Sequence, residues 1–317
     1  MIDVRDLSKR YGDKLAVDHL TFTVRPGMVT GFLGPNGAGK STTMRMILGL
    51  DRPTTGSVTV DGKPYREHPA PLREVGAILE ARAIHTGRSA YNHLLALAQT
   101  HGIPRSRVDE VIALVGLQDV ARKRVGAFSL GMGQRLGIAA ALLGDPRTLI
   151  LDEPSNGLDP EGIRWIRNLL RSLAGEGRTI LVSSHLMSEM SMMADWLIVV
   201  GRGRLIADTT VEGFVHLASG DGVRVRTPDA ARLRALAADL DGVTVREDDE
   251  GGDASALSLQ GISCEALGEL AAANRIVLHG LAPEQASLEE AFMRLTMDSV
   301  EYHAAPTPAD AAVGAGR

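Results

Sequence analysis

The sequence predicts an α/β fold followed by a small α+β ferredoxin-like domain, and three observations lead to this prediction. Over about residues 1–215, short apolar segments typical of buried strands alternate with segments of helical periodicity, a pattern that favours a largely parallel, doubly wound sheet. A glycine-rich segment, 34–42, joins one of these strands to one of these helices. From 223 onward the elements follow the order β-α-β-β-α-β, which is typical of a ferredoxin-like unit.

The glycine-rich segment fits G-x-x-x-x-G-K-[ST], the pattern of a phosphate-binding loop. Glycines let backbone N–H groups close around phosphate oxygens, and the following helix adds N–H donors and the positive end of its dipole. Lys40 can reach the β- and γ-phosphates, and the Ser41 hydroxyl can ligate Mg²⁺. A glycine-rich turn that fits by accident is the alternative, which the flanking strand and helix disfavour. We therefore expect nucleoside triphosphate binding by Gly34, Pro35, Asn36, Gly37, Ala38, Gly39, Lys40, Ser41 and Thr42.

Composition narrows the class of protein. The 317 residues suffice for roughly two domains, and the net charge of -5 gives no reason to expect a nucleic-acid partner. The single cysteine, Cys264, excludes an internal disulfide and a multi-cysteine metal site, and a small buried apolar residue is its simplest interpretation. No apolar run approaches the roughly 18 residues that span a bilayer, and no secretory signal opens the chain. We expect a cytoplasmic protein without a transmembrane segment or signal peptide.

The first domain is expected to cover residues 1–218 and to contain a helical subdomain at about 85–145. Its strands are predicted at 2–7, 20–24, 28–33, 57–60, 74–79, 148–153, 179–183 and 196–200. Tyr11 is placed in a turn with Gly12. Outside the subdomain, helices are predicted at 42–50, 160–174 and 188–194.

The glycine-rich stretch 219–222 marks the predicted domain boundary, and an α+β accessory domain is expected over 219–300. Its strands are predicted at 223–226, 243–246, 254–259 and 277–281, and its helices at 228–240, 264–274 and 287–297. The tail, 301–317, is rich in alanine, proline and glycine and lacks periodicity, so we expect it to be disordered.

Two acidic residues, Asp152 and Glu153, end the predicted buried strand 148–153. In a parallel sheet this end faces the ligand crevice, on the same edge as the phosphate-binding loop. Asp152 would hold Mg²⁺ directly or through water, and Glu153 would polarise an attacking water. A solvated acidic pair is the alternative, and the phosphate-binding loop favours the functional interpretation.

Further motifs make the chain resemble the ATP-binding cassettes, the nucleotide-binding subunits of ABC transporters, a group of P-loop NTPases with a mixed sheet. Residues 128–135, Phe-Ser-Leu-Gly-Met-Gly-Gln-Arg, resemble the family's signature motif, which usually reads Leu-Ser-Gly-Gly-Gln. Residues 155–159 resemble the D-loop, which ends in Asp159. His185 resembles the switch histidine, and Tyr11 resembles the aromatic residue that stacks on adenine. The motifs occur in the family's order over about residues 1–215.

The chain departs from the family pattern in two places. The signature has Leu130 and Met132 where Gly and Gln are usual, although Ser129 and Gly131, which suit contact with a γ-phosphate, remain. This variant resembles exporters of drugs and antibiotics whose permeases are separate chains. Glu80 stands where the family usually has Gln, and a carboxylate can still ligate Mg²⁺ or orient water.

The resemblance implies an ATP hydrolase that drives a separate integral-membrane permease and exports a drug or antibiotic-like compound from the cytoplasmic face of the membrane. It implies ATP and Mg²⁺ as cofactors and a dimer, in which each ATP lies between one phosphate-binding loop and the signature (Ser129, Gly131) of a second copy or a homologue. The implied catalytic residues are Glu153, His185 and Glu80, and the implied Mg²⁺ ligands are Ser41, Asp152 and Glu80. The alternative is a soluble ATPase of the same family that switches a non-transport partner, such as ribosome or repair machinery.

Overall fold

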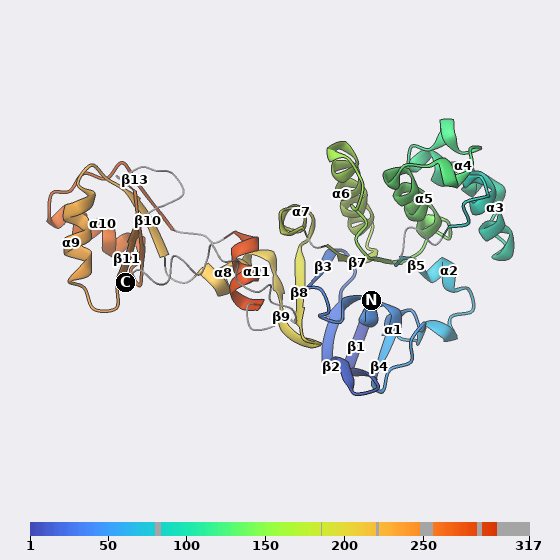
Figure 1. Ribbon diagram of the computed structural model, residues 1–317, viewed down its shortest axis with the longest axis horizontal. Helices are drawn as coiled ribbons and strands as arrows, with labels where there is room; N and C mark the ends of the chain where they lie inside the picture. The colour runs from blue at the N-terminus through green and yellow to red at the C-terminus, as the bar shows by residue number, and fades with distance from the viewer. Residues whose placement is uncertain (80–83, 185, 220–221, 248–255, 284–286, 297–317) are drawn as a thin grey trace, which may run out of the picture. The chain divides into compact units, whose positions relative to one another are not determined.

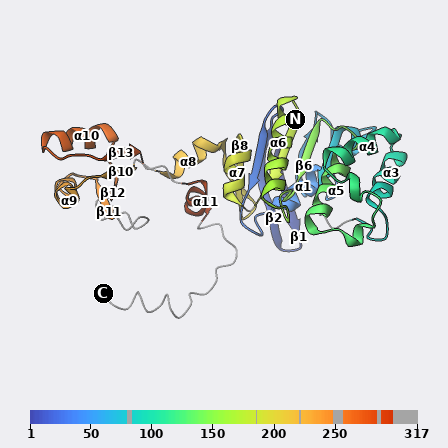
Figure 2. The same ribbon diagram turned by 90° about the horizontal axis from the view of Figure 1, so that it is seen from above.

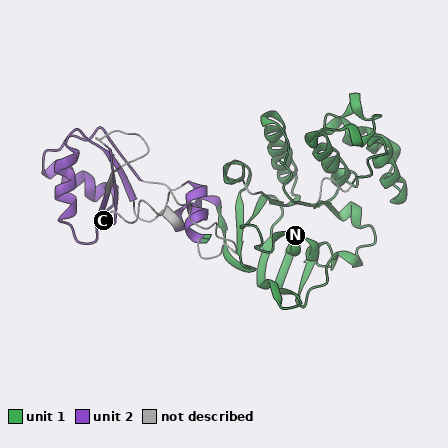
Figure 3. Cartoon of the chain, in the orientation of Figure 1, with its two compact units in different colours: residues 1–210, 296–317 green, residues 211–295 purple. Residues whose placement is uncertain are grey.

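The computed structural model describes residues 1–79, 84–184, 186–219, 222–247, 256–283 and 287–296 (Figure 1). Two of the predicted site residues, Glu80 and His185, and the predicted disordered tail lie outside these ranges. Contacts divide the chain into two compact units, residues 1–210 with 296–317 and residues 211–295 (Figure 3). The division precedes the glycine-rich stretch that suggested a boundary, and it assigns one more helix to the second unit.

The first unit contains two sheets, one mixed and one antiparallel. The six-stranded sheet has the order β5-β6-β7-β3-β8-β9, in which only the pair β8–β9 is antiparallel. Its strands are β3 (Val29–Leu33), β5 (Val75–Ile78), β6 (Thr148–Leu151), β7 (Thr179–Ser183), β8 (Trp196–Gly201) and β9 (Arg204–Thr210). The antiparallel sheet consists of β1 (Ile2–Tyr11), β2 (Lys14–Val24) and β4 (Thr55–Val60), in the order β2-β1-β4.

This arrangement confirms the predicted mixed sheet and adds detail that the sequence did not provide. The strand β9 was not predicted, and three predicted strands belong to a sheet of their own. Tyr11 ends β1 and pairs with Lys14 across a two-residue turn, so its placement in the turn itself was wrong. All five residues of β3 are buried, and the strand lies between β7 and β8, so the loop that follows it emerges at the middle of the sheet.

Three helices pack together in the region where a helical subdomain was predicted. Figure 2 shows α3, α4 and α5 gathered together, and they contact one another. The helices of the first unit are α1 (Lys40–Ile47), α2 (Pro71–Glu74), α3 (Ala90–Thr100), α4 (Arg105–Leu114), α5 (Leu130–Leu142), α6 (Pro160–Gly175) and α7 (Met187–Met193). Short 3₁₀ turns occur at Tyr65–Glu67, Gln118–Val120 and Val125–Ala127.

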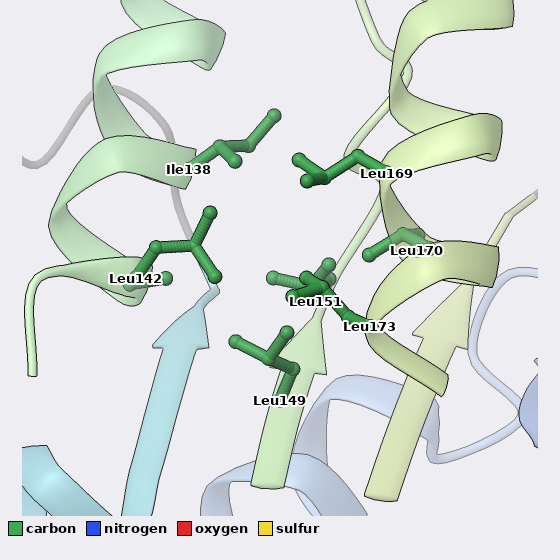
Figure 4. A pocket seen from close by; sticks show the side chains of 8 residues that line it. Ile138, Leu142, Leu149, Leu151, Leu169, Leu170 and Leu173 are labelled. Carbon is green, nitrogen blue, oxygen red and sulfur yellow. The ribbon is translucent and has the colours of Figure 1, made fainter. Parts of the chain in front are cut away.

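An aliphatic layer ties the helical subdomain to the sheet. Figure 4 shows side chains of α5, β6 and α6 pointing toward one another. The layer consists of Ile138, Ala141 and Leu142 of α5, Leu149 and Leu151 of β6, and Leu169, Leu170 and Leu173 of α6. Burying one such side chain contributes about 1.5–3 kcal/mol. The helix that carries the signature motif is therefore packed on β6, the strand that Asp152 follows.

The second unit begins with α8 (Val211–Ser219), continues as a β-α-β-β-α-β segment, and ends with α11 (Leu288–Thr296). The segment is β10 (Gly222–Arg226), α9 (Ala230–Ala238), β11 (Thr244–Glu247), β12 (Ala256–Gln260), α10 (Cys264–Ala273) and β13 (Gly280–Pro283). All strand pairs are antiparallel, in the order β11-β12-β10-β13. Val223 and Leu257 pack with Leu233 of α9 and Leu267 of α10 in a core of the unit's own. Cys264 is partly buried against this core.

None of the helices in the described ranges is long and apolar enough to cross a membrane.

A chain that ends at Thr210 should fold and bind MgATP, because the two apolar cores share no residue. The core around the antiparallel sheet reaches no further along the chain than Val200, and the core of the second unit begins at Val223. Circular dichroism should show one cooperative unfolding transition whose midpoint rises with MgATP. Insoluble protein, or a broad transition that ATP does not shift, would contradict separate cores.

Candidate nucleotide-binding site

The phosphate-binding loop follows β3 and opens α1 at Lys40. Gly37 and Gly39 have φ angles of 82° and 96°, in the left-handed region that favours glycine. A Cβ atom on Gly39 would lie 2.5 Å from the carbonyl oxygen of Ala16, and one on Gly34 would lie 2.4 Å from that of Val200. Backbone therefore fills the space that side chains would need at these positions.

Lys40 lies largely buried beside this loop. Its ammonium donates to the carbonyl oxygens of Gly34 at 2.6 Å and Pro35 at 3.3 Å. Burial lowers the pKa of Lys40, and the negative charges of Glu153 and Asp152 act in the opposite direction. Both predicted acids are thus close enough to act on the loop lysine.

The Asp152 carboxylate joins the loop helix to the sheet edge. Its Oδ2 accepts a hydrogen bond from the Ser41 hydroxyl at 3.0 Å, and its Oδ1 accepts one from the Ser183 hydroxyl at the end of β7. Ser41 and Asp152 offer the hard oxygen donors that Mg²⁺ prefers. In the described part of the chain, no three His, Cys, Asp or Glu side chains form a group that could hold a metal ion. The two oxygens therefore fit an Mg²⁺ that takes its other ligands from phosphates and water.

Glu153 has a backbone conformation that non-glycine residues rarely adopt, with φ at 52°. Its N–H donates to the Ser183 hydroxyl at 3.0 Å. Its carbonyl oxygen accepts from the Gln134 side-chain amide at 3.1 Å and from the Asn156 N–H at 3.2 Å. Strained backbone of this kind clusters at functional sites, where the surroundings hold it in place.

Two of these supporting residues, Ser183 and Gln134, were not predicted from the sequence. Both are buried, with 0% and 2% of their surface exposed. Only their positions in the sequence could have indicated a role. Ser183 ends a strand just before the switch-histidine position, and Gln134 lies inside the signature segment. Only the fold shows that both hydrogen-bond to Glu153.

The signature and the D-loop are the N-terminal caps of two neighbouring helices. The Ser129 hydroxyl oxygen accepts from the Met132 N–H at 3.2 Å and caps α5, and the Asp159 carboxylate accepts from the Gly162 N–H at 2.9 Å and caps α6. A Cβ on Gly131 would lie 2.7 Å from the Gly157 carbonyl oxygen, so the two loops are in close contact.

The unusual Leu130 takes part in this contact. A Cβ atom on Gly157 would lie 2.4 Å from Leu130 Cγ and Cδ2, and Gly157 has a φ of 75°. The leucine side chain therefore occupies the place that a side chain at 157 would need. The departure from the family pattern at 130 is matched by a glycine in the D-loop.

Tyr11 is about half exposed and is anchored at its hydroxyl. The hydroxyl donates to Asp51 Oδ2 at 2.9 Å, and the same oxygen accepts from Arg45 Nε at 2.8 Å. Burial raises the pKa of Tyr11, and the hydrogen bond to the Asp51 carboxylate adds to the rise. The Lys9 ammonium lies 4.9 Å from the ring centroid. The hydroxyl thus lies near the last turn of α1, and part of the ring surface is open.

Comparisons with known proteins identify the family. Residues 17–156 match the model of the ABC transporter family. The chain is 46% identical over 220 residues to the bacitracin transport ATP-binding protein BcrA of Bacillus licheniformis. The aligned region covers 68% of this chain and 71% of that protein. The chain belongs to the ABC transporter ATP-binding subunits. The predicted family and cassette fold are thereby confirmed, and this ABC ATPase is an ATP-hydrolysing enzyme.

Other similar proteins support the same family assignment. The lantibiotic transport ATP-binding protein SrtF of Streptococcus pyogenes is 37% identical, over 68% of this chain and 94% of its own length. A solved ATP-binding subunit of an ABC transporter superposes with a TM-score of 0.63 at 28% identity, over 68% of this chain and 91% of that chain. A dimeric bacterial ABC transporter cassette superposes with a TM-score of 0.62 at 23% identity, over 66% of this chain and 98% of that chain. Residues 124–191 also match an AAA domain model (putative AbiEii toxin), and residues 221–289 a domain of unknown function.

The fit between Leu130 and Gly157 can be tested through stability. Gly157→Ala should lower the free energy of unfolding by about 1–2 kcal/mol, because the left-handed backbone disfavours a Cβ atom, and by more where Leu130 must move. Gly133→Ala is the matched control, since a Cβ on this glycine of α5 would meet nothing within 4 Å, and it should not destabilise the protein. Urea unfolding measures both.

The double variant Leu130→Gly/Gly157→Ala separates the two causes of that loss. If Leu130 is in the way, Gly157→Ala should cost less stability in the Leu130→Gly background than in the wild-type protein. If Gly157→Ala costs the same with and without Leu130, backbone strain alone explains it and the fitted pair is disproved.

Proposed function

We propose that this ABC ATPase energises a separate membrane permease that exports a drug or antibiotic-like compound. The observation that carries the proposal is the 46% identity to a protein named for bacitracin transport, supported by the 37% identity to a lantibiotic transport protein. The exported compound would meet the permease, whereas this chain supplies ATP hydrolysis from the cytoplasmic face of the membrane.

The site supports a division of roles among the residues at the end of β6. The loop N–H groups and the Lys40 ammonium would bind the β- and γ-phosphates, and Ser41 and Asp152 would hold Mg²⁺, which neutralises phosphate charge when bound. Glu153 follows the Mg²⁺ ligand directly and would polarise the attacking water. As the family resemblance implies, His185 would contact the γ-phosphate, and Glu80 would ligate Mg²⁺ or orient the attacking water.

Each chain carries one phosphate-binding loop and one signature, so we infer that two chains complete two sites. The first turn of α5 offers the Ser129 hydroxyl and the N–H groups of a helix N-terminus, which attract a phosphate. Tyr11 would stack on the adenine at the other end of the nucleotide, with its hydroxyl held by Asp51. The partner is a second copy of this chain or a homologous ATP-binding subunit.

Glu153→Gln should bind MgATP, hydrolyse it very slowly and accumulate as an ATP-bound dimer. The amide has nearly the shape of the carboxylate but cannot accept a proton from the attacking water. Lys40 and Asp152 remain to hold phosphates and metal. Because ATP binds the completed dimer interface, it shifts the equilibrium between monomer and dimer toward the dimer. Size-exclusion chromatography with and without MgATP measures the dimer.

Ser129→Arg in the Glu153→Gln background is the control for that dimer. The arginine would fill the space of the partner's γ-phosphate and should keep the protein monomeric at all ATP concentrations. A dimer that forms equally with this arginine, or without ATP, would contradict a nucleotide held between the phosphate-binding loop and the signature.

Lys40→Ala should abolish export as well as ATP hydrolysis, because no other side chain of the described loop brings a positive charge to the phosphates. Cells that express the wild-type chain with its permease should tolerate more of a peptide antibiotic such as bacitracin than cells with Lys40→Ala. Equal susceptibility across peptide antibiotics, together with a non-membrane protein as the co-purified partner, would favour the switch ATPase instead.

A further inference from the structure

We propose that Gln134 is a positioning residue for Glu153: from the signature helix, it holds the backbone of the base that acts on the chain's own nucleotide. This inference rests on the proposed roles of Glu153 and the signature. One helix then acts on two nucleotides. The first turn of α5 contacts the partner's nucleotide, and Gln134 in the next turn supports the base that acts on the chain's own nucleotide.

The contact is built into the core of the site. Gln134 is 2% exposed, and its Nε2 lies 3.1 Å from the Glu153 carbonyl oxygen. A buried side-chain amide keeps such a bond because an unpaired buried polar group is costly. Gln134 therefore holds a fixed place between α5 and the end of β6.

The contact acts on a backbone that needs support. Glu153 has a φ of 52°, and the hydrogen bonds that hold its peptide groups include those of Ser183, Asn156 and Gln134. Ser183 accepts the Glu153 N–H from β7, and Asn156 donates to the carbonyl from within the same tight turn. Gln134 is the donor that reaches Glu153 from the helical subdomain. Because φ and ψ set where a side chain points, a shift of this donor would re-aim the carboxylate.

The same helix connects this donor to the signature. Ser129 caps α5, and Gln134 follows Leu130 by four residues, which is about one helical turn. A hydrogen-bonded helix moves as a rigid segment over so short a distance. The helix that presents the signature to the partner's phosphate therefore also carries the donor that supports the chain's own base.

Gln134→Met tests this contact, because methionine has a similar length, is apolar and lacks the donor. Steady-state MgATP hydrolysis by the full-length chain should show kcat lowered about tenfold and KM for ATP changed by less than about threefold, as expected for an interaction that acts in the chemical step. Ile138→Val is the matched control, since it removes one buried methylene from the same helix and should leave kcat within about twofold.

The decisive measurement combines Gln134→Met with Glu153→Gln. If Gln134 acts through Glu153, it has nothing left to position once the carboxylate is gone, so the double variant should hydrolyse ATP as slowly as Glu153→Gln alone. The double variant should still form the MgATP-dependent dimer. If the two losses multiply, or if Gln134→Met raises KM and leaves kcat unchanged, Gln134 is not a positioning residue.

A second variant guards against misfolding of the first. Gln134→Asn keeps the amide but is one methylene shorter, so it stays polar while its donor falls short of the carbonyl, and it should also lower kcat. Unchanged kcat in both folded variants, with Glu153→Gln inactive, would overturn this inference and leave the proposed function intact. Active Glu153→Gln would instead overturn the proposed function.

Discussion

The site depends on one carboxylate, that of Asp152. Its two oxygens accept hydrogen bonds from Ser41 of α1 and Ser183 of β7, and its N–H donates to the Ile78 carbonyl oxygen of β5 at 2.7 Å. One residue therefore connects the loop helix to three neighbouring strands at the carboxyl edge of the sheet. Because Ser41 and Asp152 are also the oxygens that fit Mg²⁺, the atoms that would bind the metal are already placed by a direct hydrogen bond.

The neighbouring Glu153 shows how the fold supports a strained backbone. A non-glycine residue in the left-handed region costs roughly 1–2 kcal/mol, and stays there when surrounding bonds determine it. Ser183 serves both acids, since its hydroxyl donates to Asp152 and accepts from the Glu153 N–H. Asp152 and Glu153 are thus positioned by one serine, which couples their geometry.

Local patterns predicted the parts of the fold that depend on local sequence. The phosphate-binding loop, the acidic strand end and the signature were identified because each is a contiguous motif. The strand β9 and its pairing with β8 were missed, although Arg202-Gly203 between the two strands, with φ of 47° and 80°, is a readable hairpin signal. Gln134 and Ser183 could not have been assigned to Glu153, because their contact depends on how α5 and β7 pack around β6.

The departure from the family pattern at Leu130 has a structural explanation. Leu130 has a physical counterpart in Gly157, whose missing side chain leaves the space that the leucine fills. Gly131 approaches the carbonyl of that same glycine, so the signature and the D-loop of one chain form a single fitted contact. A substitution in either loop therefore has to be considered together with the other. Since Gln134 of α5 also donates to the Glu153 carbonyl oxygen, we propose that a change at the signature affects the chain's own base as well as the partner's nucleotide.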